Sequence, residues 1–583
     1  MSDLKQHVHD RVVAALEAMT GAPPSADAVA AIQLNPPKNR AHGDVSLATF
    51  QLAKLAGEPP PKFAAALAER LTADDVIEAV QVAGPFLNVR YRRDTLAERA
   101  VAGVLAGRTP FAPSEQEGET IVIDFSSPNI AKPFHMGHLR STVIGAALCR
   151  IHRHVGHRVE GVNHLGDWGM PFAKMMTAWM RFGDEAELKK APMRHMFDLY
   201  RRYGAEAKEH PELDEEAAQH FRNLESGADN EERKMWQFLR DESLQAFQGP
   251  YDRLKVTFDH FTGESFYEDK MEPAMAKVEA AGVLEKDEGA EVVKLDELGI
   301  KVPCLLRKSD GATLYHTRDL AAAFYREETF HPARILYVVG AEQKLHFEQL
   351  KGVLKRMGEP LADKVEHVPF GLILAQNPDT GKWEKFASRG GNAIFLDEVL
   401  DEAVAAVKKV IAEKNPDLED PDAVAEQIGV GAIVFNDLKN SRIKDVKFDW
   451  DQMLNFDGET GPYVQYAVAR LAGILRKAEV DPDATAELLD GLEWQHLADA
   501  EQVLLTMHDF GPAVQRAADQ SEPSIITNLM IQLAGEIHAY LRDHHVLSAE
   551  PPVRAARLAL VQAARQLLKT GLGLLGVAAP DRM

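Results

Sequence analysis

The stretch SSPNIAKPFHMGHLRST, residues 126–142, follows the apolar run TIVIDF and precedes a segment with helical periodicity. A helix that begins near Gly137 would point its free backbone N–H groups above the preceding strand, where they favour phosphate, and the glycine would let a flat group approach the backbone. His135 and His138 would face the same side and can donate ring N–H bonds to phosphate oxygens, while Lys132 adds positive charge. Two isolated histidines near a turn are more often surface residues, and a phosphate-binding turn is the alternative that these surroundings offer.

Strands and helices alternate on both sides of this stretch. The apolar runs at 120–125, 158–166 and 334–340 are each followed by a segment with helical periodicity. Strands that alternate with helices favour parallel pairing, so we expect an α/β fold with a doubly wound sheet. Ligands of such sheets bind at the carboxyl ends of the strands, which is where residues 126–142 would lie.

Four regions are expected along the chain. Residues 1–112 mix helical periodicity with two strand-like runs and end in a linker rich in Pro, Gly, Ser and Glu. Residues 113–375 hold the alternating core, interrupted over about 175–265 by charged helices that indicate an insertion. Residues 376–457 connect this core to residues 458–583, which are almost wholly helical and predict a helical bundle.

The composition is ordinary for a folded protein, with 583 residues of which 45% are hydrophobic and 27% charged. The formal charge of −23 argues against a basic surface for unspecific nucleic-acid binding, and it leaves a specific nucleic-acid partner open. Cys149 and Cys304 lie far apart without a CxxC partner, so we expect no disulfide framework, no cysteine zinc site and a reducing cytoplasm. The apolar windows are shorter than the roughly 18 residues that a membrane span needs, and the charged N-terminus is unlike a signal peptide.

The run D-F-S-S-P-N-x-A-K-P-x-H-x-G-H-L-R-S-T resembles the signature of class I aminoacyl-tRNA synthetases, in the form found in arginyl-tRNA synthetases. The resemblance implies that His135 and His138 stabilise charge on the ATP phosphates while the amino-acid carboxylate attacks the α-phosphorus. It also implies a Rossmann-type doubly wound catalytic core with a helical insertion. On either side of the core it implies an N-terminal α/β additional domain that contacts the tRNA elbow and a C-terminal all-α anticodon-binding bundle.

A second signature of this family, KMSKS followed by GN, aligns with KFASRGGN at 385–392 in a degraded form. Ser388 stands where the family normally has a lysine that stabilises the transition state. Arginyl enzymes that lack this lysine tend to carry one just before the first signature, so the resemblance assigns the missing charge to Lys132. The implied ATP-binding residues are His135, Gly137, His138, Lys385, Ser388 and Arg389, with Gly391 and Asn392 completing the second signature.

Recognition of an arginine side chain needs carboxylates that can pair with a planar guanidinium. LYHTRDLAAA at 314–323 resembles the family's Y-x-T-R-D segment, in which tyrosine and aspartate contact the substrate side chain. FTGES at 261–265 resembles a further acidic contact, and residue 124 is a plausible acidic position at the end of a strand. Without the resemblance, each of these residues would more often be a salt-bridge or capping residue. The implied arginine-binding residues are Asp124, Ser127, Asn129, His138, Glu264, Tyr315, Asp319 and Gln343.

The sequence therefore predicts an arginine–tRNA ligase that activates L-arginine with ATP and Mg²⁺ and transfers it to the 2′-hydroxyl of the terminal adenosine of tRNA(Arg). We expect bound tRNA to be required for activation, and we expect a cytoplasmic monomer with no membrane partner and no metal ligands of its own. Three alternatives stay open at this point: a synthetase for another amino acid, an RNA-binding or adenylate-binding paralogue without catalysis, and a simple nucleotidyltransferase that uses HxGH.

Overall fold

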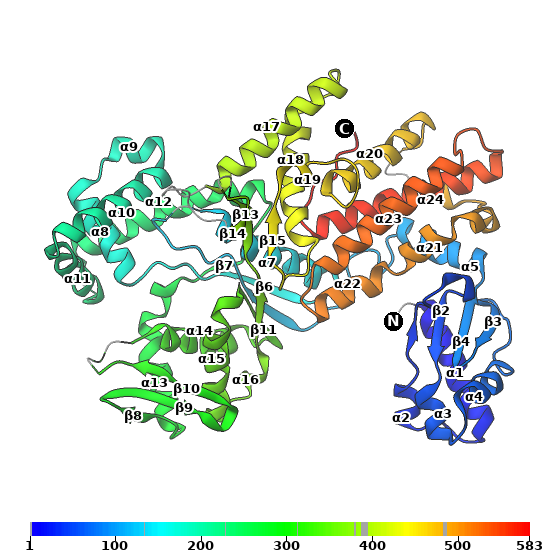
Figure 1. The fold of residues 1–583 in the computed structure, drawn as a ribbon, viewed down its shortest axis with the longest axis horizontal. Helices are drawn as coiled ribbons and strands as arrows, with labels where there is room; N and C mark the ends of the chain where they lie inside the picture. The colour runs from blue at the N-terminus through cyan, green and yellow to red at the C-terminus, as the bar shows by residue number, and fades with distance from the viewer. Residues whose placement is uncertain are drawn as a thin grey trace.

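The computed structural model describes residues 3–132, 134–227, 229–309, 311, 313–377, 380–385, 395–481, 485 and 487–583. A parallel sheet lies at the centre, the helical insertion and a small antiparallel lobe lie on one side, and the C-terminal helices and the N-terminal domain lie on the other (Figure 1). Among the described residues, no helix is both long and apolar enough to cross a membrane.

The central sheet has the strand order β12-β11-β5-β6-β7, and every pairing in it is parallel. Its strands are β5 (Thr120–Asp124), β6 (Arg158–Asn163), β7 (His260–Phe261), β11 (Arg334–Gly340) and β12 (Val365–Phe370). The order reverses between β5 and β11, so the ends of these two strands form a topological switch point, which is the usual ligand site of such a sheet. The doubly wound α/β prediction is confirmed.

Two hydrophobic cores cover the two faces of this sheet. Side chains alternate along a strand, so Ile121 and Ile123 enter the core that contains α7 (Met136–His154). Val122 enters the opposite core, together with residues of α14 (Tyr315–Phe330) and α15 (Lys344–Met357). The helix that follows the first signature is therefore packed against one face, and the Y-x-T-R-D helix against the other.

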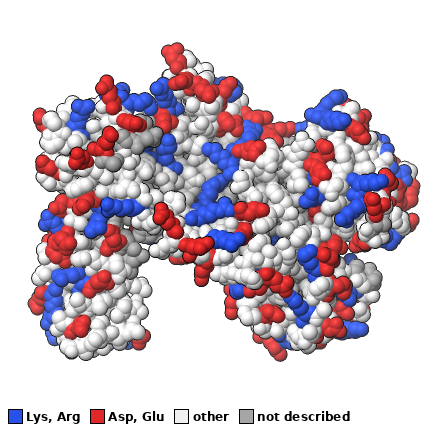
Figure 2. All heavy atoms as spheres, turned by 180° about the vertical axis from the view of Figure 1, so that it is seen from behind, with Lys and Arg blue, Asp and Glu red and all other residues white. Residues whose placement is uncertain are grey.

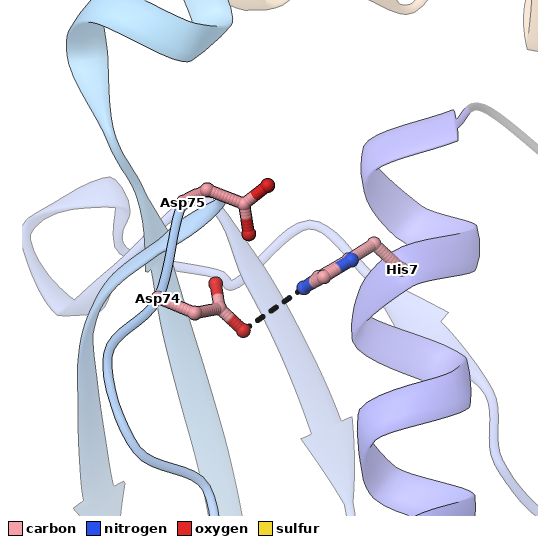
Figure 3. A group of neighbouring side chains, drawn as sticks. All are labelled: His7, Asp74 and Asp75. Atoms are coloured by element: carbon pink, nitrogen blue, oxygen red, sulfur yellow. Dashed lines mark hydrogen bonds and ion pairs between the residues drawn. The ribbon is translucent and has the colours of Figure 1, made fainter.

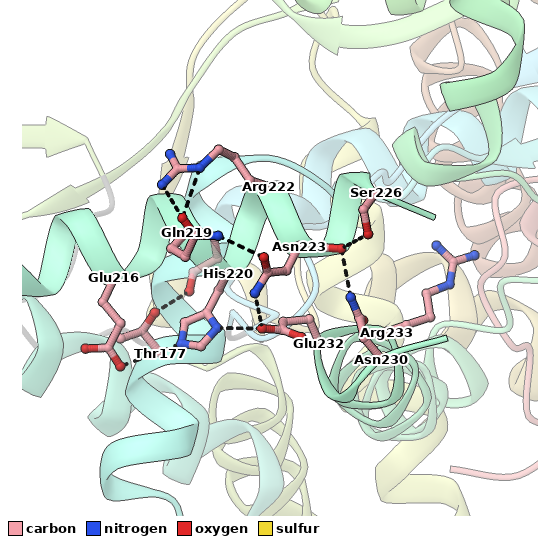
Figure 4. Close-up of polar contacts among 11 residues, drawn as sticks. Thr177, Glu216, Gln219, His220, Arg222, Asn223, Ser226, Asn230, Glu232 and Arg233 are labelled. Carbon is pink, nitrogen blue, oxygen red and sulfur yellow. Dashed lines mark hydrogen bonds and ion pairs between the residues drawn. The ribbon is translucent and has the colours of Figure 1, made fainter. Parts of the chain in front are cut away.

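The predicted insertion consists of the helices α8 (Met170–Phe182), α9 (Glu185–Lys190), α10 (Pro192–Glu209), α11 (Glu212–Glu225) and α12 (Glu231–Arg253). They surround a hydrophobic core of their own. On α11, the His220 ring contacts Glu216 at 3.6 Å and Glu232 of α12 at 3.0 Å (Figure 4). Asn223 donates to the same Glu232 carboxylate at 2.7 Å. This polar cluster ties α11 to α12, and α12 then runs back toward the central sheet.

The insertion is followed by a lobe that packs beside the sheet. It contains α13 (Met271–Ala280) and an antiparallel sheet of β8 (Glu285–Asp287), β9 (Ala290–Leu295) and β10 (Ile300–Arg307). The short helix α16 (Leu361–Lys364) leads into β12 of the central sheet. After β12, a separate small sheet forms in which β13 (Ile373–Gln376) pairs with β14 (Trp383–Lys385) and β15 (Val446–Phe448). The strand β14 ends where the second signature begins.

The N-terminal domain is an antiparallel sheet of order β1-β2-β4-β3 covered by helices. Its elements are α1 (Asp3–Thr20), α2 (Ala26–Ala30), β1 (Leu34–Asn35), β2 (Val45–Ala48), α3 (Phe50–Ala56), α4 (Pro60–Ala68), β3 (Ile77–Ala83) and β4 (Phe86–Tyr91). His7, Asp74 and Asp75 lie close together (Figure 3). Asp74 already accepts two backbone N–H bonds and contacts the Arg11 guanidinium at 3.2 Å. A cation would compete with this guanidinium, so we interpret the group as a structural contact.

From residue 396 onward the described secondary structure is helical apart from β15, and helices were expected for residues 458–583. Its helices are α17 (Leu396–Lys414), α18 (Pro421–Leu438), α19 (Trp450–Met453), α20 (Gly461–Lys477), α21 (Glu501–His508), α22 (Phe510–Asp519), α23 (Ser524–Asp543) and α24 (Pro551–Leu574), and α5 (Arg93–Ala97) and α6 (Gly103–Leu105) join the N-terminal domain to them. Arg140 of α7 and Asp437 of α18 are both buried, and Nε of the arginine lies 2.9 Å from Oδ1 of the aspartate. The parallel-sheet core and the helical region are thus joined by a buried ion pair.

Candidate active site at the switch point of the parallel sheet

The loop after β5 has an irregular backbone that its surroundings hold in place. Ser126 and Ala131 adopt left-handed conformations with φ of 70° and 56°, which L residues other than glycine rarely adopt. The Ser126 N–H donates to Oγ of Ser141 at 2.9 Å, and the Ser126 hydroxyl bonds the Tyr251 hydroxyl at 2.9 Å. The Ala131 N–H donates to Oγ of Ser243 at 2.9 Å. Both strained residues are therefore fixed, and Tyr251 and Ser243 come from the insertion helix α12.

The two signature histidines cap the start of α7. Nδ1 of His135 accepts the Gly137 N–H at 2.9 Å, and Nδ1 of His138 accepts the His135 N–H at 3.2 Å. Burial lowers the pKa of His138 to about 3, and burial together with the charge of Lys132 lowers the pKa of His135. Both rings are neutral at physiological pH, and because Nδ1 accepts in each, the ring proton lies on Nε2. Each histidine thus offers an Nε2–H donor.

Lys132 is a half-buried cation beside these histidines. Burial lowers the pKa of its ammonium group, against the opposing charge of Glu264. Its Nζ lies 5.5 Å from the ring centroid of Tyr200 on α10, and both residues line a small hollow together with Asn129 and Trp168. Among the described residues, no carboxylate lies within ion-pair distance of this ammonium. The charge is available to an anion that enters the site.

The segment that carries the second signature returns to the first. Lys385, the last residue of β14, lies 3.6 Å from Glu342, and its charge contributes to the lowered pKa of His135. Past the signature, Phe395 forms a β-bridge with His135, and the Leu396 N–H donates to the Phe134 carbonyl at 3.0 Å. The two signature regions therefore meet. The predicted residues Ser388 and Arg389, with Gly391 and Asn392, lie outside the described residues.

Asp124, at the end of β5, is held by protein donors on both carboxylate oxygens. Arg326 of α14 donates to Oδ2 at 2.6 Å and Ser127 donates to Oδ1 at 3.0 Å. Asp124 and Arg326 are almost completely buried. These two bonds already neutralise and satisfy the Asp124 carboxylate. Its predicted contact with substrate arginine therefore stays a prediction. The sequence analysis did not identify Arg326 as a site residue. Arg326 is seven residues after Asp319 and therefore lies on the same face of the helix, and this spacing could have indicated it.

Two further predicted acids lie near this pair. The Asp319 carboxylate is hydrogen-bonded to the His346 ring, and although burial opposes ionisation, this contact lowers the pKa of Asp319. Glu264 begins a short helical turn and lies 3.8 Å from the guanidinium of Arg318. Burial, against the opposing charge of Arg318, raises the pKa of Glu264 to about 7. The site thus holds one acid that is ionised and one that titrates near neutrality.

The remaining predicted residues stand around the opening of the site. Tyr315, the first residue of α14, is 60% exposed, although Asp319 on the same helix is partly buried. Gln343 follows β11 and is exposed. Asn129 forms a β-bridge with Gly166, where an added Cβ would lie 2.2 Å from the Asn129 Oδ1. This close approach explains the glycine at position 166. The exposed side chains of Tyr315 and Gln343 can meet a ligand.

Family models match three parts of the chain. The model described as tRNA synthetases class I (R), catalytic domain, matches residues 100–450. The arginyl tRNA synthetase N terminal domain matches residues 6–91, and the DALR anticodon binding domain matches residues 464–583. The matches follow the order of the N-terminal domain, the parallel-sheet core and the C-terminal helices.

Curated relatives match over nearly the whole length. An arginine–tRNA ligase of an Exiguobacterium species is 46% identical over 547 residues, which cover 94% of this chain and 95% of that protein. One from Streptococcus pneumoniae is 44% identical over 553 residues, with the same coverage. The solved arginyl-tRNA synthetase of Thermus thermophilus has a TM-score of 0.84 at 25% identity and covers 99% of this chain and 100% of its own. That of Plasmodium falciparum has a TM-score of 0.81 at 22% identity over 100% of both chains, which supports the fold alone.

Proposed function

The chain belongs to the arginyl-tRNA synthetase family and is an arginine–tRNA ligase, and from this premise we propose how its residues carry out the reaction. Membership of this family sets aside a synthetase for another amino acid, a non-catalytic paralogue and a simple nucleotidyltransferase. The substrates are arginine, ATP and tRNA. We propose that ATP arrives as its magnesium complex, since Mg²⁺ binds through substrate phosphates and few protein ligands.

The observation that carries the mechanism is the pair of Nε2–H donors at the start of α7. Their Nδ1 atoms are committed to backbone N–H groups, so the rings cannot turn away without breaking the cap of α7. An ATP molecule above the switch point would place its phosphates against these donors and against the Lys132 ammonium. The donors then stabilise charge on the transferring phosphoryl group, and neither histidine acts as a nucleophile.

Adenylate formation then proceeds by a single displacement. A carboxylate oxygen of arginine attacks the α-phosphorus of ATP, the bond to the bridging oxygen breaks, and pyrophosphate leaves with the negative charge that His135, His138 and Lys132 stabilise. The 2′-hydroxyl of the terminal tRNA adenosine next attacks the arginyl carbonyl. The bond from the carbonyl carbon to the AMP phosphate breaks, and the hydroxyl proton passes to that phosphate as AMP departs. We propose that bound tRNA is required for the first step as well.

Arginine-dependent exchange between ATP and labelled pyrophosphate, with and without tRNA(Arg), tests this mechanism. We expect exchange with arginine and cognate tRNA, and none with lysine. Exchange of equal rate without tRNA would contradict the tRNA requirement. Exchange with another amino acid would contradict the proposed arginine pocket.

We propose that the arginine side chain lies between Asp319 and Glu264, with Tyr315 closing over it and Gln343, Asn129 and Ser127 near its α-amino and carboxylate end. The two acids come from different elements, α14 and the turn after β7, and they interact electrostatically across the site. A guanidinium held by separate carboxylates is distinguished from the point charge of a lysine ammonium by its planar donors.

The affinity for arginine should depend on pH through Glu264. Because burial raises its pKa to about 7, Glu264 is largely neutral below that pH and pairs with a guanidinium only after losing its proton. We expect the KM for arginine to fall about tenfold between about pH 6 and about pH 8, since the ionised fraction rises by that factor. The Glu264→Gln variant should show a flat profile over this range. A wild-type profile that stays flat would contradict the role of Glu264.

We propose that the anticodon loop docks on the C-terminal helices. A cavity of about 510 Å³ lies between the end of α17, α20 and the chain terminus, lined by Tyr466, Arg470 and Met583 among others. Tyr466 is 47% exposed, and its ring stacks on His538 with centroids 5.8 Å apart. An exposed aromatic ring beside an arginine is the usual combination for holding an unpaired base.

The surface charge is locally uneven. Figure 2 shows acidic and basic side chains mixed over most of one face, with Lys and Arg gathering toward its centre. Contact with tRNA would therefore use local basic surface despite the net charge of −23.

Removal of the Tyr466 ring should weaken tRNA binding specifically. We expect Tyr466→Ala to raise the Kd for tRNA(Arg) about tenfold, because a base that stacks on an aromatic ring contributes about 1–3 kcal/mol. Filter binding measures this change. At saturating tRNA, the rate of arginine activation should equal that of the wild type. An unchanged Kd would place the anticodon loop elsewhere.

We also propose that the enzyme acts as a monomer in the cytoplasm, where its tRNA substrate is used. Sedimentation equilibrium with and without tRNA tests the first part. A concentration-dependent dimer would contradict it.

A further inference from the structure

The ammonium of Lys132 sits at a defined place although it has no ion partner among the described residues. The contact that the structure gives it is the Tyr200 ring, at 5.5 Å from the ring centroid. The opposing charge that acts on it is that of Glu264. A long, flexible lysine side chain would otherwise sample many rotamers, so this aromatic face restricts where the charge lies.

The backbone before Lys132 is also held by the insertion. Ala131 adopts a left-handed conformation with φ of 56°, and its N–H donates to Oγ of Ser243 at 2.9 Å. The Ser243 hydroxyl in turn donates to the Leu239 carbonyl at 2.6 Å, and its side chain is completely buried. Because the hydroxyl both accepts and donates, it fixes the position of Ala131 relative to α12.

The helix that carries Tyr200 is docked on the second signature region through its first two turns. The Arg194 guanidinium lies over the Phe395 ring at 4.7 Å, and the Phe197 ring meets Phe395 edge-on with centroids 6.1 Å apart. Arg194 also pairs with Glu398. Since Phe395 forms the β-bridge with His135, α10 is fixed with respect to both signatures.

We propose that the helical insertion positions Lys132 for adenylate formation, with Tyr200 of α10 holding the ammonium group and Ser243 of α12 holding the backbone that leads to it. Tyr200 is thus a positioning residue, and it acts only through Lys132. The inference rests on the proposed role of Lys132. It gives the insertion a function inside the active site: a cation supplied by the first signature loop is held by a segment that belongs to neither signature.

Two variants of Tyr200 test this inference. Tyr200→Leu should lower the kcat of arginine-dependent pyrophosphate exchange about tenfold, which corresponds to the loss of a partly buried cation–π contact. The KM for arginine and the Kd for tRNA should not change, because Tyr200 touches neither. Tyr200→Phe keeps the aromatic face and should keep the wild-type kcat.

Tyr203 offers a matched control on the same helix. It also lies beneath a lysine, with Lys174 at 5.9 Å from its ring centroid, but it faces the interior of the insertion and its hydroxyl bonds the Leu213 carbonyl. Tyr203→Leu should lower the melting temperature more than Tyr200→Leu does and leave kcat nearly unchanged. If it lowers kcat as much as Tyr200→Leu, general loosening of the insertion explains both, and the inference fails.

A double variant of Lys132 and Tyr200 separates this inference from the proposed role of Lys132 on which it rests. In a Lys132→Met background, Tyr200→Leu should have no further effect on kcat, because the group that it positions is gone. An impaired Lys132→Met enzyme together with a fully active Tyr200→Leu enzyme would overturn the role of Tyr200 alone. Full activity of Lys132→Met would overturn the role of Lys132, and the inference with it.

Discussion

Replacement of Lys132 by alanine is expected to slow the formation of arginyl-adenylate about 100-fold to 1,000-fold, while the affinity for tRNA(Arg) stays close to that of the wild type. The loss is that of one preorganised group aimed at charge that develops in the transition state. Lys132 is half-buried and has no ion-pair partner among the described residues, so its charge is strongly felt in the site. Single-turnover formation of labelled adenylate measures the effect, and filter binding measures the tRNA affinity.

Lys174 provides the matched control for this variant. It too lies over a tyrosine ring of α10, but it is paired with Asp214 at 2.9 Å on the outside of the insertion. Lys174→Ala should leave adenylate formation unchanged.

A second comparison asks whether the positive charge can be moved from the first signature to the second. Adding Ser388→Lys to the Lys132→Ala variant should restore part of the lost activity. If Lys132→Ala is as active as the wild type, the compensation for the serine at position 388 is refuted.

The fold followed from the sequence because its signal is local. Each apolar strand, each helical period and the signature motif at 126–142 lies within a short segment. Together they predicted the doubly wound sheet that the structure has. The alignment of His135 and His138 at the start of a helix was likewise a matter of spacing. The structure adds that their Nδ1 atoms accept backbone N–H bonds, which leaves Nε2 as the ring nitrogen that can donate to a ligand.

Contacts between distant segments could not be predicted in the same way. Arg326 pairs with Asp124 across about 200 residues of sequence, and only the packing of α14 on the sheet brings them together. Tyr200 reaches Lys132 from an insertion whose sequence indicates charged helices and nothing about their docking. The sequence predicts the groups that would touch the substrate, whereas the groups that position them depend on tertiary packing.

The choice of arginine over other amino acids should depend most strongly on Asp319. We expect Asp319→Asn to raise the KM for arginine about 100-fold to 1,000-fold, because a guanidinium would enter a partly buried site without the carboxylate that pairs with it. The asparagine keeps the size of the side chain and one acceptor for the His346 ring, so the fold of α14 should persist. Initial rates of pyrophosphate exchange against arginine concentration measure the effect, and the KM for ATP should not change.

Glu268 supplies the control for Asp319, since it pairs with Arg318 at 3.0 Å and adds to the same acidic surroundings without a proposed contact to the substrate. Glu268→Gln should change the KM for arginine little. The comparison decides between two explanations of specificity. If both variants raise the KM for arginine equally, arginine is attracted by the summed negative charge of the site, and Asp319 makes no specific contact with it. If only Asp319→Asn does so, recognition depends on the position of one carboxylate, which the lowered pKa of Asp319 keeps ionised while Glu264 titrates near neutrality.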